Sequence, residues 1–221
     1  MKTTQRLLNA TKDIWKAYNE HPFVMGIQDG TLARDKFRYY IMQDFIYLKD
    51  YAKVYALGVA KAKSMESANL FGKYIGVMNG ELDVHRGYIG RIGVTQEEID
   101  AMKPSLDNLS YTSYMMRIAY DEGEVEILTA VLSCAYSYEV IAKKIIENRP
   151  ESVDDPFYGD WIRGYASDEY AAGNAILMDT LDRLSSHYTD AQLEHLEDIF
   201  VACSRYELAF WQMAWCGEGS C

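Results

Sequence analysis

Proline is scarce in this chain, and its spacing leaves long stretches uninterrupted. The 221 residues contain four prolines, at positions 22, 104, 150 and 156, so none occurs between residues 23 and 103. Proline in a helix interior removes a hydrogen bond and clashes with the preceding turn. Long helices are therefore permitted through most of the chain, although proline scarcity by itself does not require them.

Apolar residues recur at helical spacing almost throughout. Near the N-terminus one face collects Leu7, Leu8, Thr11, Ile14, Trp15 and Tyr18. We expect this helix to end at His21-Pro22-Phe23, and Asp29-Gly30-Thr31 to form a turn and N-cap. Further helices are predicted over residues 32–63, 66–92, 95–103, 111–120, 125–147, 161–165, from 167 onward, and 189–216. The spacing of Thr95 to Glu98 and of Thr189 to Gln192 is typical of capping boxes.

No β-alternating run competes with these helices. The chain also lacks a fixed-period repeat, a low-complexity tract and a Gly/Ser linker. The sequence therefore predicts an all-α fold, a single helical bundle that occupies residues 1–221 as one domain.

The charge balance excludes several classes of partner. Thirty-three acidic against 22 basic residues give a formal charge of -11, with no basic run able to track phosphates, so nucleic acid is not expected as a partner. Apolar segments such as residues 127–134 fall short of the ~20 residues that span a bilayer. The polar N-terminus lacks a signal core. We expect a soluble cytoplasmic protein with no membrane partner.

Cysteine and histidine spacing argues against a metal site or a cofactor. The four cysteines, at positions 134, 203, 216 and 221, show no CxxC motif and are expected as free thiols. Di-iron bundles need Glu-x-x-His on two helices, whereas Glu81 and His85 are four apart and the spacing never recurs. His21, His187 and His195 have no supporting pattern for haem and are interpreted, like His85, as capping, core or surface residues.

Asp44, Tyr47 and Tyr51 lie at spacings of three and four, so one helix side carries all three. The residues around Asp44 are apolar, so exposing this whole helix face to water would be unfavourable. The pattern favours a buried carboxylate that needs hydrogen-bonding partners over a solvated charge.

Cys134 and Tyr138 are four residues apart and therefore adjacent on one helix face. A nucleophilic cysteine needs a stabilised thiolate or a nearby base. This helix contains no histidine, so spacing alone favours a small buried hydrophobe over a nucleophile.

Glu207, Phe210 and Trp211 fall at i, i+3 and i+4, which gives one carboxylate two large aromatic neighbours. In apolar surroundings such a carboxyl group has a raised pKa and can act as a general acid or base near neutral pH. The alternative is a surface glutamate beside a core stripe.

Taken together, several ordered segments resemble the thiaminase II (TenA) family over nearly the whole chain. The matching segments are His21-Pro22-Phe23, Asp29-Gly30-Thr31-Leu32, Gln43-Asp44 with Tyr47, Tyr111-Thr112-Ser113-Tyr114-Met115, residues 134–138, Tyr158 with Trp161 and Tyr165, and Tyr206-Glu207 with Phe210-Trp211. The resemblance implies the haem-oxygenase-like fold, a homotetramer, and no cofactor.

The resemblance also implies an activity, that of a hydrolase acting on a small-molecule pyrimidine. Family members convert 4-amino-5-aminomethyl-2-methylpyrimidine, or thiamin, to 4-amino-5-hydroxymethyl-2-methylpyrimidine, a step of thiamin salvage. Cys134 matches the family's nucleophile and Glu207 its acid/base. Asp44 matches the residue that holds the aminopyrimidine edge, and the pocket's aromatic residues match Tyr47, Tyr111, Tyr138, Tyr165 and Phe210.

Two alternatives remain open from the sequence. One is a redox enzyme of the same fold that uses haem, a quinone or a metal, against which the histidine pattern counts. The other is a non-catalytic regulatory protein that binds pyrimidines.

Overall fold

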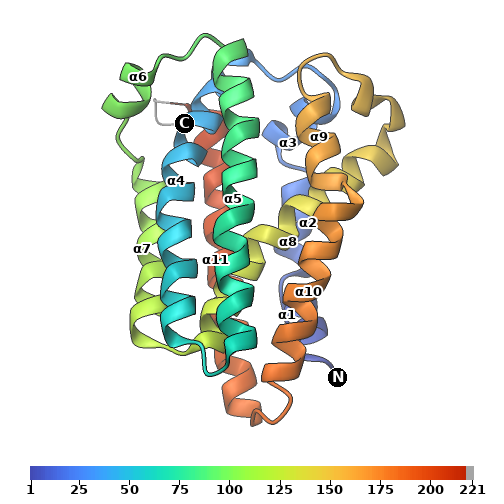
Figure 1. Cartoon of the computed structure of the whole chain (residues 1–221). Coiled ribbons are helices and arrows are strands. Elements are labelled where there is room, and N and C mark those ends of the chain that lie inside the picture. Colours follow the sequence, from blue (N-terminus) through green and yellow to red (C-terminus); the bar gives the residue numbers. More distant parts are fainter. Residues whose placement is uncertain (218–221) are drawn as a thin grey trace. The chain divides into compact units, whose positions relative to one another are not determined.

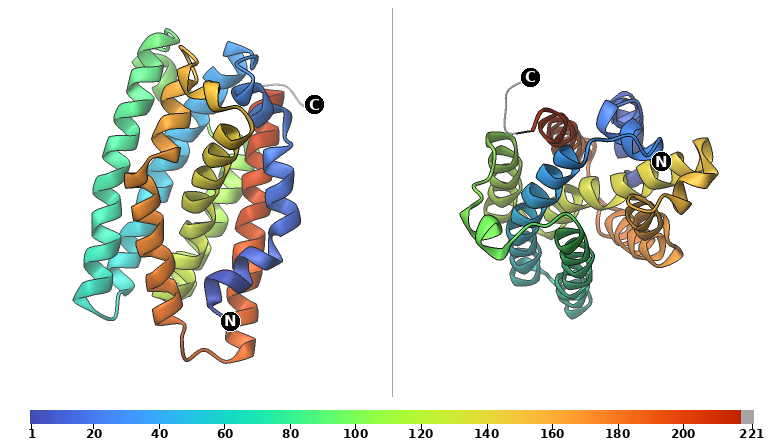
Figure 2. Two further views of the ribbon diagram at one scale, coloured as in Figure 1. Left: turned by 90° about the vertical axis from the view of Figure 1, so that its right-hand side faces the viewer. Right: turned by 90° about the horizontal axis from the view of Figure 1, so that it is seen from above.

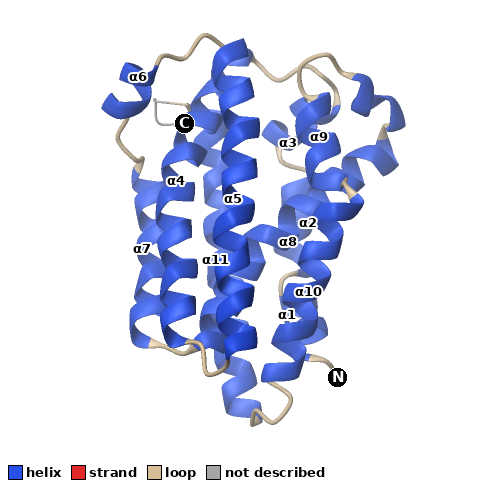
Figure 3. Cartoon of the chain, viewed as in Figure 1, coloured by secondary structure: helices blue, strands red, loops and turns tan. Residues whose placement is uncertain are grey.

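The computed structural model describes residues 1–217, without the side chains of residues 77–87 and 96, and every regular element in this part of the chain is a helix (Figure 3). Eleven are α-helices and one is a 3-10 helix. In chain order they are α1 (Thr3–Ala10), α2 (Lys12–Asn19), α3 (Pro22–Gln28), α4 (Arg34–Lys61), α5 (Met65–Arg91), α6 (Gln96–Ala101), α7 (Leu106–Asp121), α8 (Glu124–Asn148), η1 (Pro150–Asp154), α9 (Gly159–Ala166), α10 (Asp168–Leu184) and α11 (Asp190–Cys216). The predicted all-α class is confirmed.

The chain divides into two compact units, which we describe separately. The first unit contains residues 1–32 and 128–212, and the second contains residues 33–127 and the chain from 213 onward. Two of the three boundaries fall inside long helices, α8 and α11, and the third lies in the segment between α3 and α4. The expectation of one domain over residues 1–221 stays a prediction.

In the second unit, α4 lies beside both α5 and α7 (Figure 1). Gly58 of α4 makes the close approach to α5 possible, because a Cβ at this position would lie 2.5 Å from the Phe71 ring. On the α7 side, Asn108 Nδ2 donates to the Gln43 carbonyl at 2.8 Å and to Gln43 Oε1 at 3.0 Å. A glycine contact and a buried amide pair thus fix α4 between its neighbours.

In the first unit, α1 and α2 lie alongside α11, as Figure 2 shows. Arg6 pairs with Glu197 at 2.8 Å, and the rings of Trp15 and Phe200 have centroids 5.8 Å apart. The predicted single N-terminal helix is broken at Thr11, whose hydroxyl donates to the Leu7 carbonyl at 3.0 Å. A threonine that bonds back to its own helix in this way competes with the helix backbone.

Most predicted helix starts are confirmed. The Thr95–Glu98 capping box forms with both bonds, and Thr189 and Gln192 exchange the equivalent pair at 3.0 and 3.4 Å. The predicted N-cap at Thr31 is wrong, since α4 begins at Arg34. The amides of Thr31 and Leu32 both donate to the Gly26 carbonyl at 2.9 Å, so this segment closes the preceding helix instead.

Helix α8 is both long and strongly apolar. By length and mean hydropathy it is sufficient to cross a membrane, which the shorter apolar segments noted in the sequence did not suggest. The structure buries 83% of its apolar window, however. Burial of this extent is typical of a core helix in a folded domain.

Candidate active site

Helix α8 carries two predicted site residues of the first unit on one side. Cys134 is 8% exposed and Tyr138 is 4% exposed, and their spacing of four residues makes them neighbours on the helix surface. Cys134 is a free thiol, and its backbone carbonyl accepts a hydrogen bond from Ser137 Oγ at 2.9 Å. The candidate nucleophile is therefore held on a core helix with little contact to solvent.

The other cysteines differ from Cys134 and from one another. Cys203 is also a free thiol, but it is fully buried, and burial followed by the charge of Glu207 raises its pKa well above the ordinary value. Cys216 is in a disulfide, so the expectation of a free thiol at this position is wrong. Cys221 lies outside the described residues.

Glu207 of α11 is only 2% exposed, which excludes its interpretation as a surface residue. Phe210 and Trp211, on the same side of the helix, are 2% and 0% exposed. Little water can reach a carboxyl group in such surroundings, and its charged form is costly unless the protein stabilises it. The structure thus encloses this candidate acid/base within the protein.

Tyr18 of α2 connects the two candidate catalytic groups. Its side chain is buried, and burial raises its pKa well above the ordinary value, with further contributions from the carboxyl group of Glu207 and the thiols of Cys134 and Cys203. The carboxyl group and both thiols therefore act on one phenol electrostatically. The sequence analysis had used Tyr18 only as a position on an apolar helix face, because nothing local distinguishes it from other buried tyrosines.

Aromatic rings cluster around Tyr138 in the first unit. The Tyr138 and Tyr165 rings have centroids 4.7 Å apart, so two of the predicted pocket residues are brought together. Trp161 and Trp211 add to the cluster, at 5.9 and 5.3 Å from Tyr138. The two tryptophans were part of the matching segments but not of the predicted site.

The second unit holds the remaining predicted residues. Asp44 is 4% exposed, which confirms the interpretation of a buried carboxylate. The Tyr47 ring lies 5.3 Å from Tyr111 and 5.2 Å from Tyr51 between centroids, and the Tyr47 hydroxyl contacts Met115 Sδ at 3.7 Å. Spacing along α4 brought Asp44 and Tyr47 to one side, whereas the Tyr47–Tyr111 contact depends on how α7 packs.

The predicted site residues thus form two sets. The first unit contains Cys134, Tyr138, Tyr165, Glu207 and Phe210, and the second contains Asp44, Tyr47 and Tyr111. That both sets line one pocket stays a prediction.

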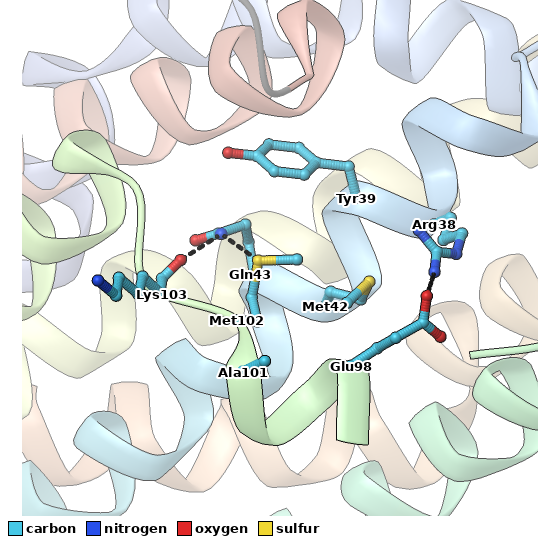
Figure 4. Close-up of a pocket in the computed structure, with 8 residues that line it drawn as sticks. All are labelled: Arg38, Tyr39, Met42, Gln43, Glu98, Ala101, Met102 and Lys103. Atoms are coloured by element: carbon cyan, nitrogen blue, oxygen red, sulfur yellow. Dashed lines mark hydrogen bonds and ion pairs between the residues drawn. The ribbon is translucent and has the colours of Figure 1, made fainter. Parts of the chain in front are cut away.

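A hollow of about 480 Å³ in the second unit lies apart from these residues (Figure 4). It is lined by Arg38, Tyr39, Met42, Gln43, Glu98, Ala101, Met102 and Lys103. At one end Arg38 pairs with Glu98 at 2.5 Å. Gln43 Nε2 donates to the Lys103 carbonyl at 3.0 Å, and its Oε1 accepts from the Ser105 amide at 3.0 Å. Since these polar groups already serve the protein's own structure, we assign no ligand to this hollow.

His21 has a structural role at the start of α3. Its Nδ1 accepts from the Phe23 amide at 3.2 Å as the N-cap of α3, and its Nε2 lies 3.1 Å from Gln212 Oε1. Glu81 and His85 lie outside the described side chains. Among the side chains that the structure does describe, no cluster of three or more His, Cys, Asp or Glu is arranged to hold a metal ion.

A known protein family matches most of the chain. The model of the TENA/THI-4/PQQC family matches residues 8–217. The chain belongs to this family. The match contains all eight predicted site residues, so the predicted set lies wholly inside the family region.

Three relatives that match over nearly their full length carry the same description. An aminopyrimidine aminohydrolase of Helicobacter pylori is 41% identical over 216 residues, covering 97% of this chain and 99% of that protein. Aminopyrimidine aminohydrolases of Halalkalibacterium halodurans and Bacillus subtilis are 38% and 34% identical, over 97% and 99% of this chain and 96% and 92% of theirs.

Solved structures agree on the fold. A TenA homologue from P. horikoshii superposes with a TM-score of 0.88 at 31% identity, covering 97% of this chain and 99% of that one. A domain with a heme oxygenase-like fold from Shewanella denitrificans has a TM-score of 0.77 at 14% identity, covering 97% and 92% of the two chains. The predicted haem-oxygenase-like fold is confirmed.

Proposed function

We propose that this protein is an aminopyrimidine aminohydrolase of the thiaminase II type. It hydrolyses 4-amino-5-aminomethyl-2-methylpyrimidine, and also thiamin, to 4-amino-5-hydroxymethyl-2-methylpyrimidine for thiamin salvage. The observation that carries the proposal is that Cys134 and Glu207 are both buried within the first unit. The 41% identity to an aminopyrimidine aminohydrolase supports the same substrate class.

In the proposed reaction, the Cys134 thiolate adds to the pyrimidine ring and forms a C–S bond, while a ring nitrogen takes up a proton. Ammonia then leaves from the exocyclic methylene as its C–N bond breaks. Water adds to the methylene carbon and gives up a proton. The ring nitrogen then releases the proton that it took up, and the C–S bond breaks so that the thiolate departs as the ring regains aromaticity. No oxidant or cofactor is needed to balance these steps.

Glu207 is the proposed proton carrier. Addition of a thiolate puts electron density on a ring nitrogen, which a nearby acid must protonate. Glu207 is 2% exposed, and in this proposal its carboxyl group supplies the proton that the leaving amine takes up. The enclosed position also keeps its electrostatic effect strong.

Asp44 and the aromatic residues are the proposed substrate-binding groups. An aminopyrimidine is flat and offers N–H donors along one edge, which a buried carboxylate can accept. Aromatic faces complement its ring. Asp44 is therefore assigned to the amine edge, and the ring faces are assigned to Tyr47, Tyr111, Tyr138, Tyr165 and Phe210.

The test is release of ammonia and of the hydroxymethyl pyrimidine by the purified protein. Cys134→Ala and Glu207→Gln should each reduce kcat by about a thousandfold or more, as loss of a nucleophile or acid/base does elsewhere. Cys203→Ala is the matched control, because Cys203 is a buried thiol near Glu207 with no proposed role. Full turnover by Cys134→Ala would disprove the covalent mechanism.

We infer in addition that the enzyme works in the cytoplasm as a homotetramer. Family resemblance supports the tetramer, and the acidic balance of the chain suits neither nucleic acid nor an anionic membrane surface as a partner. Light scattering should give four times the chain mass of 25.3 kDa. A monomer at micromolar concentration would contradict this assembly.

A further inference from the structure

Ser204 of α11 is a meeting point for three helices of the first unit. Its side chain is 0% exposed, and its hydroxyl accepts a hydrogen bond from Trp15 Nε1 on α2 at 3.0 Å. The same hydroxyl lies 3.0 Å from Ser133 Oγ on α8. Ser133 directly precedes Cys134, and Ser204 lies three residues before Glu207. The bond between the two serines therefore joins the helices that carry both candidate catalytic groups, beside those groups.

Tyr18 adds a second bond at the same point. Its hydroxyl, on a side chain that is 1% exposed, donates to the Ser204 carbonyl at 2.5 Å. This carbonyl belongs to the helical turn that leads into Glu207, since residues three and four apart share a helix side. A short bond inside a low-dielectric core resists displacement more than its counterpart at the surface does.

We propose that Tyr18, Ser204 and Ser133 are positioning residues that fix the Cys134 sulfur relative to the Glu207 carboxyl group. This proposal rests on the proposed function of these two groups. None of the three residues needs to touch the substrate. They act through the backbone turns that carry the nucleophile and the acid/base.

Electrostatics at Tyr18 agrees with this geometry. Burial raises the pKa of the Tyr18 phenol, and the carboxyl group of Glu207 and the thiols of Cys134 and Cys203 add to this effect. A phenol with a raised pKa stays protonated through the working pH range and remains a hydrogen-bond donor. The Tyr18 hydroxyl therefore keeps the proton that it donates to the Ser204 carbonyl.

The hydrogen bonds of these three residues should affect the rate of reaction through the positions of Cys134 and Glu207. Misplacement of a catalytic group by about 1 Å can cost about a hundredfold in rate. We call Tyr18, Ser133 and Ser204 the hub. Loss of one of its hydrogen bonds should reduce kcat. KM should change little, because the hub contains none of the proposed ring-binding residues. Other buried hydrogen bonds of the first unit should affect stability alone.

The experiment compares Tyr18→Phe with Tyr158→Phe. Tyr158 is also 1% exposed, and its hydroxyl donates to the Leu32 carbonyl at 2.6 Å, so each substitution removes one buried bond of the same kind. We expect similar decreases in Tm, but a decrease in kcat of about tenfold or more for Tyr18→Phe alone. Ser133→Ala deletes a single hydroxyl and should lower kcat in the same direction, with KM within about threefold of wild type. It also serves as the second variant if Tyr18→Phe does not fold.

Two results would overturn the proposal. One is a kcat within twofold of wild type in folded Tyr18→Phe and Ser133→Ala. The other is an equal loss of kcat in Tyr18→Phe and Tyr158→Phe, which would indicate a general loss of stability.

A separate measurement distinguishes failure of the hub from failure of the proposed function. Iodoacetamide alkylation of Cys134, followed by peptide mass spectrometry, reports on the thiol without turnover. The hub predicts a rate changed by about threefold or more in Tyr18→Phe but not in Tyr158→Phe. Equal alkylation rates in both variants and wild type would count against the hub. Undiminished turnover in Cys134→Ala would instead count against the proposed function.

Discussion

The side-chain amide of Asn174 on α10 donates a hydrogen bond of 2.7 Å to Glu139 Oε2 on α8. Glu139 is 7% exposed, and its other carboxylate oxygen accepts from Lys143 Nζ at 2.6 Å. The same amide reaches the Ala135 carbonyl at 3.2 Å. Helix α10 is thereby attached to α8 at the residue that follows Cys134.

Asn174→Ala should lower the free energy of unfolding by about 2 kcal/mol, because it removes a hydrogen bond to a buried charged group. Urea unfolding followed by circular dichroism measures this loss. Asn148→Ala is the control, since the Asn148 bond to Gln28 at 3.0 Å is exposed and should contribute no more than about 0.5 kcal/mol. Equal effects of the two substitutions would contradict the importance of burial.

Gly58→Ala should destabilise the protein by about 1–3 kcal/mol, although alanine is the better helix former. The new Cβ would lie 2.5 Å from Phe71 Cδ1, which forces α4 and α5 apart or distorts the ring. Gly72→Ala on α5 is the matched control, because no atom lies within 4 Å of its added Cβ. That control should gain up to about 1 kcal/mol from helix propensity. Thermal unfolding of both variants tests the contrast, and a stabilised Gly58→Ala protein would be inconsistent with the packing.

Stability should fall as the pH decreases below about 6.5, in part because of His21. Burial lowers the pKa of His21, against the opposing effect of its bond to Gln212. The unfolded chain then binds a proton at higher pH than the folded chain does. The His21 contribution is thus fully present above the unfolded pKa and is lost as the pH falls toward the folded pKa.

His21→Asn tests this component, since asparagine is a good N-cap and does not titrate. The difference in free energy of unfolding between pH 7.5 and pH 5.5 should be smaller in His21→Asn than in wild type. An identical pH dependence in wild type and His21→Asn would show that His21 does not contribute.

Asp44→Asn should raise KM for the aminomethyl pyrimidine by about tenfold or more, because the neutral amide loses a charge-assisted hydrogen bond to the substrate amine. Steady-state kinetics on the folded variant measures this KM. The control is Asp50→Asn on the same helix, where the carboxylate pairs with Lys53 at 2.6 Å and has no proposed substrate role. An unchanged KM in Asp44→Asn would show that Asp44 does not bind the substrate.

Local patterns predicted the helices well where their causes are local. Capping at Thr95 depends on two residues three apart, and it formed as expected. The start of α4 was misplaced because the amides after Gly30 bond to the end of the preceding helix, a contact that the Thr31 side chain does not reveal. Burial of Asp44 followed from its apolar neighbours, whereas burial of Glu207 needed the packed structure to decide between two interpretations.

The sequence by itself determined the all-α class, most helix bounds and, through an ordered set of motifs, the family and its candidate residues. These features depend on spacings of three and four residues and on short segments that keep their order. Only the tertiary structure decided that Tyr18, Ser133 and Ser204 meet beside Cys134 and Glu207. The two ends of this network are separated by more than a hundred positions in the chain, and a hydrogen bond between them exists only after α2, α8 and α11 have packed.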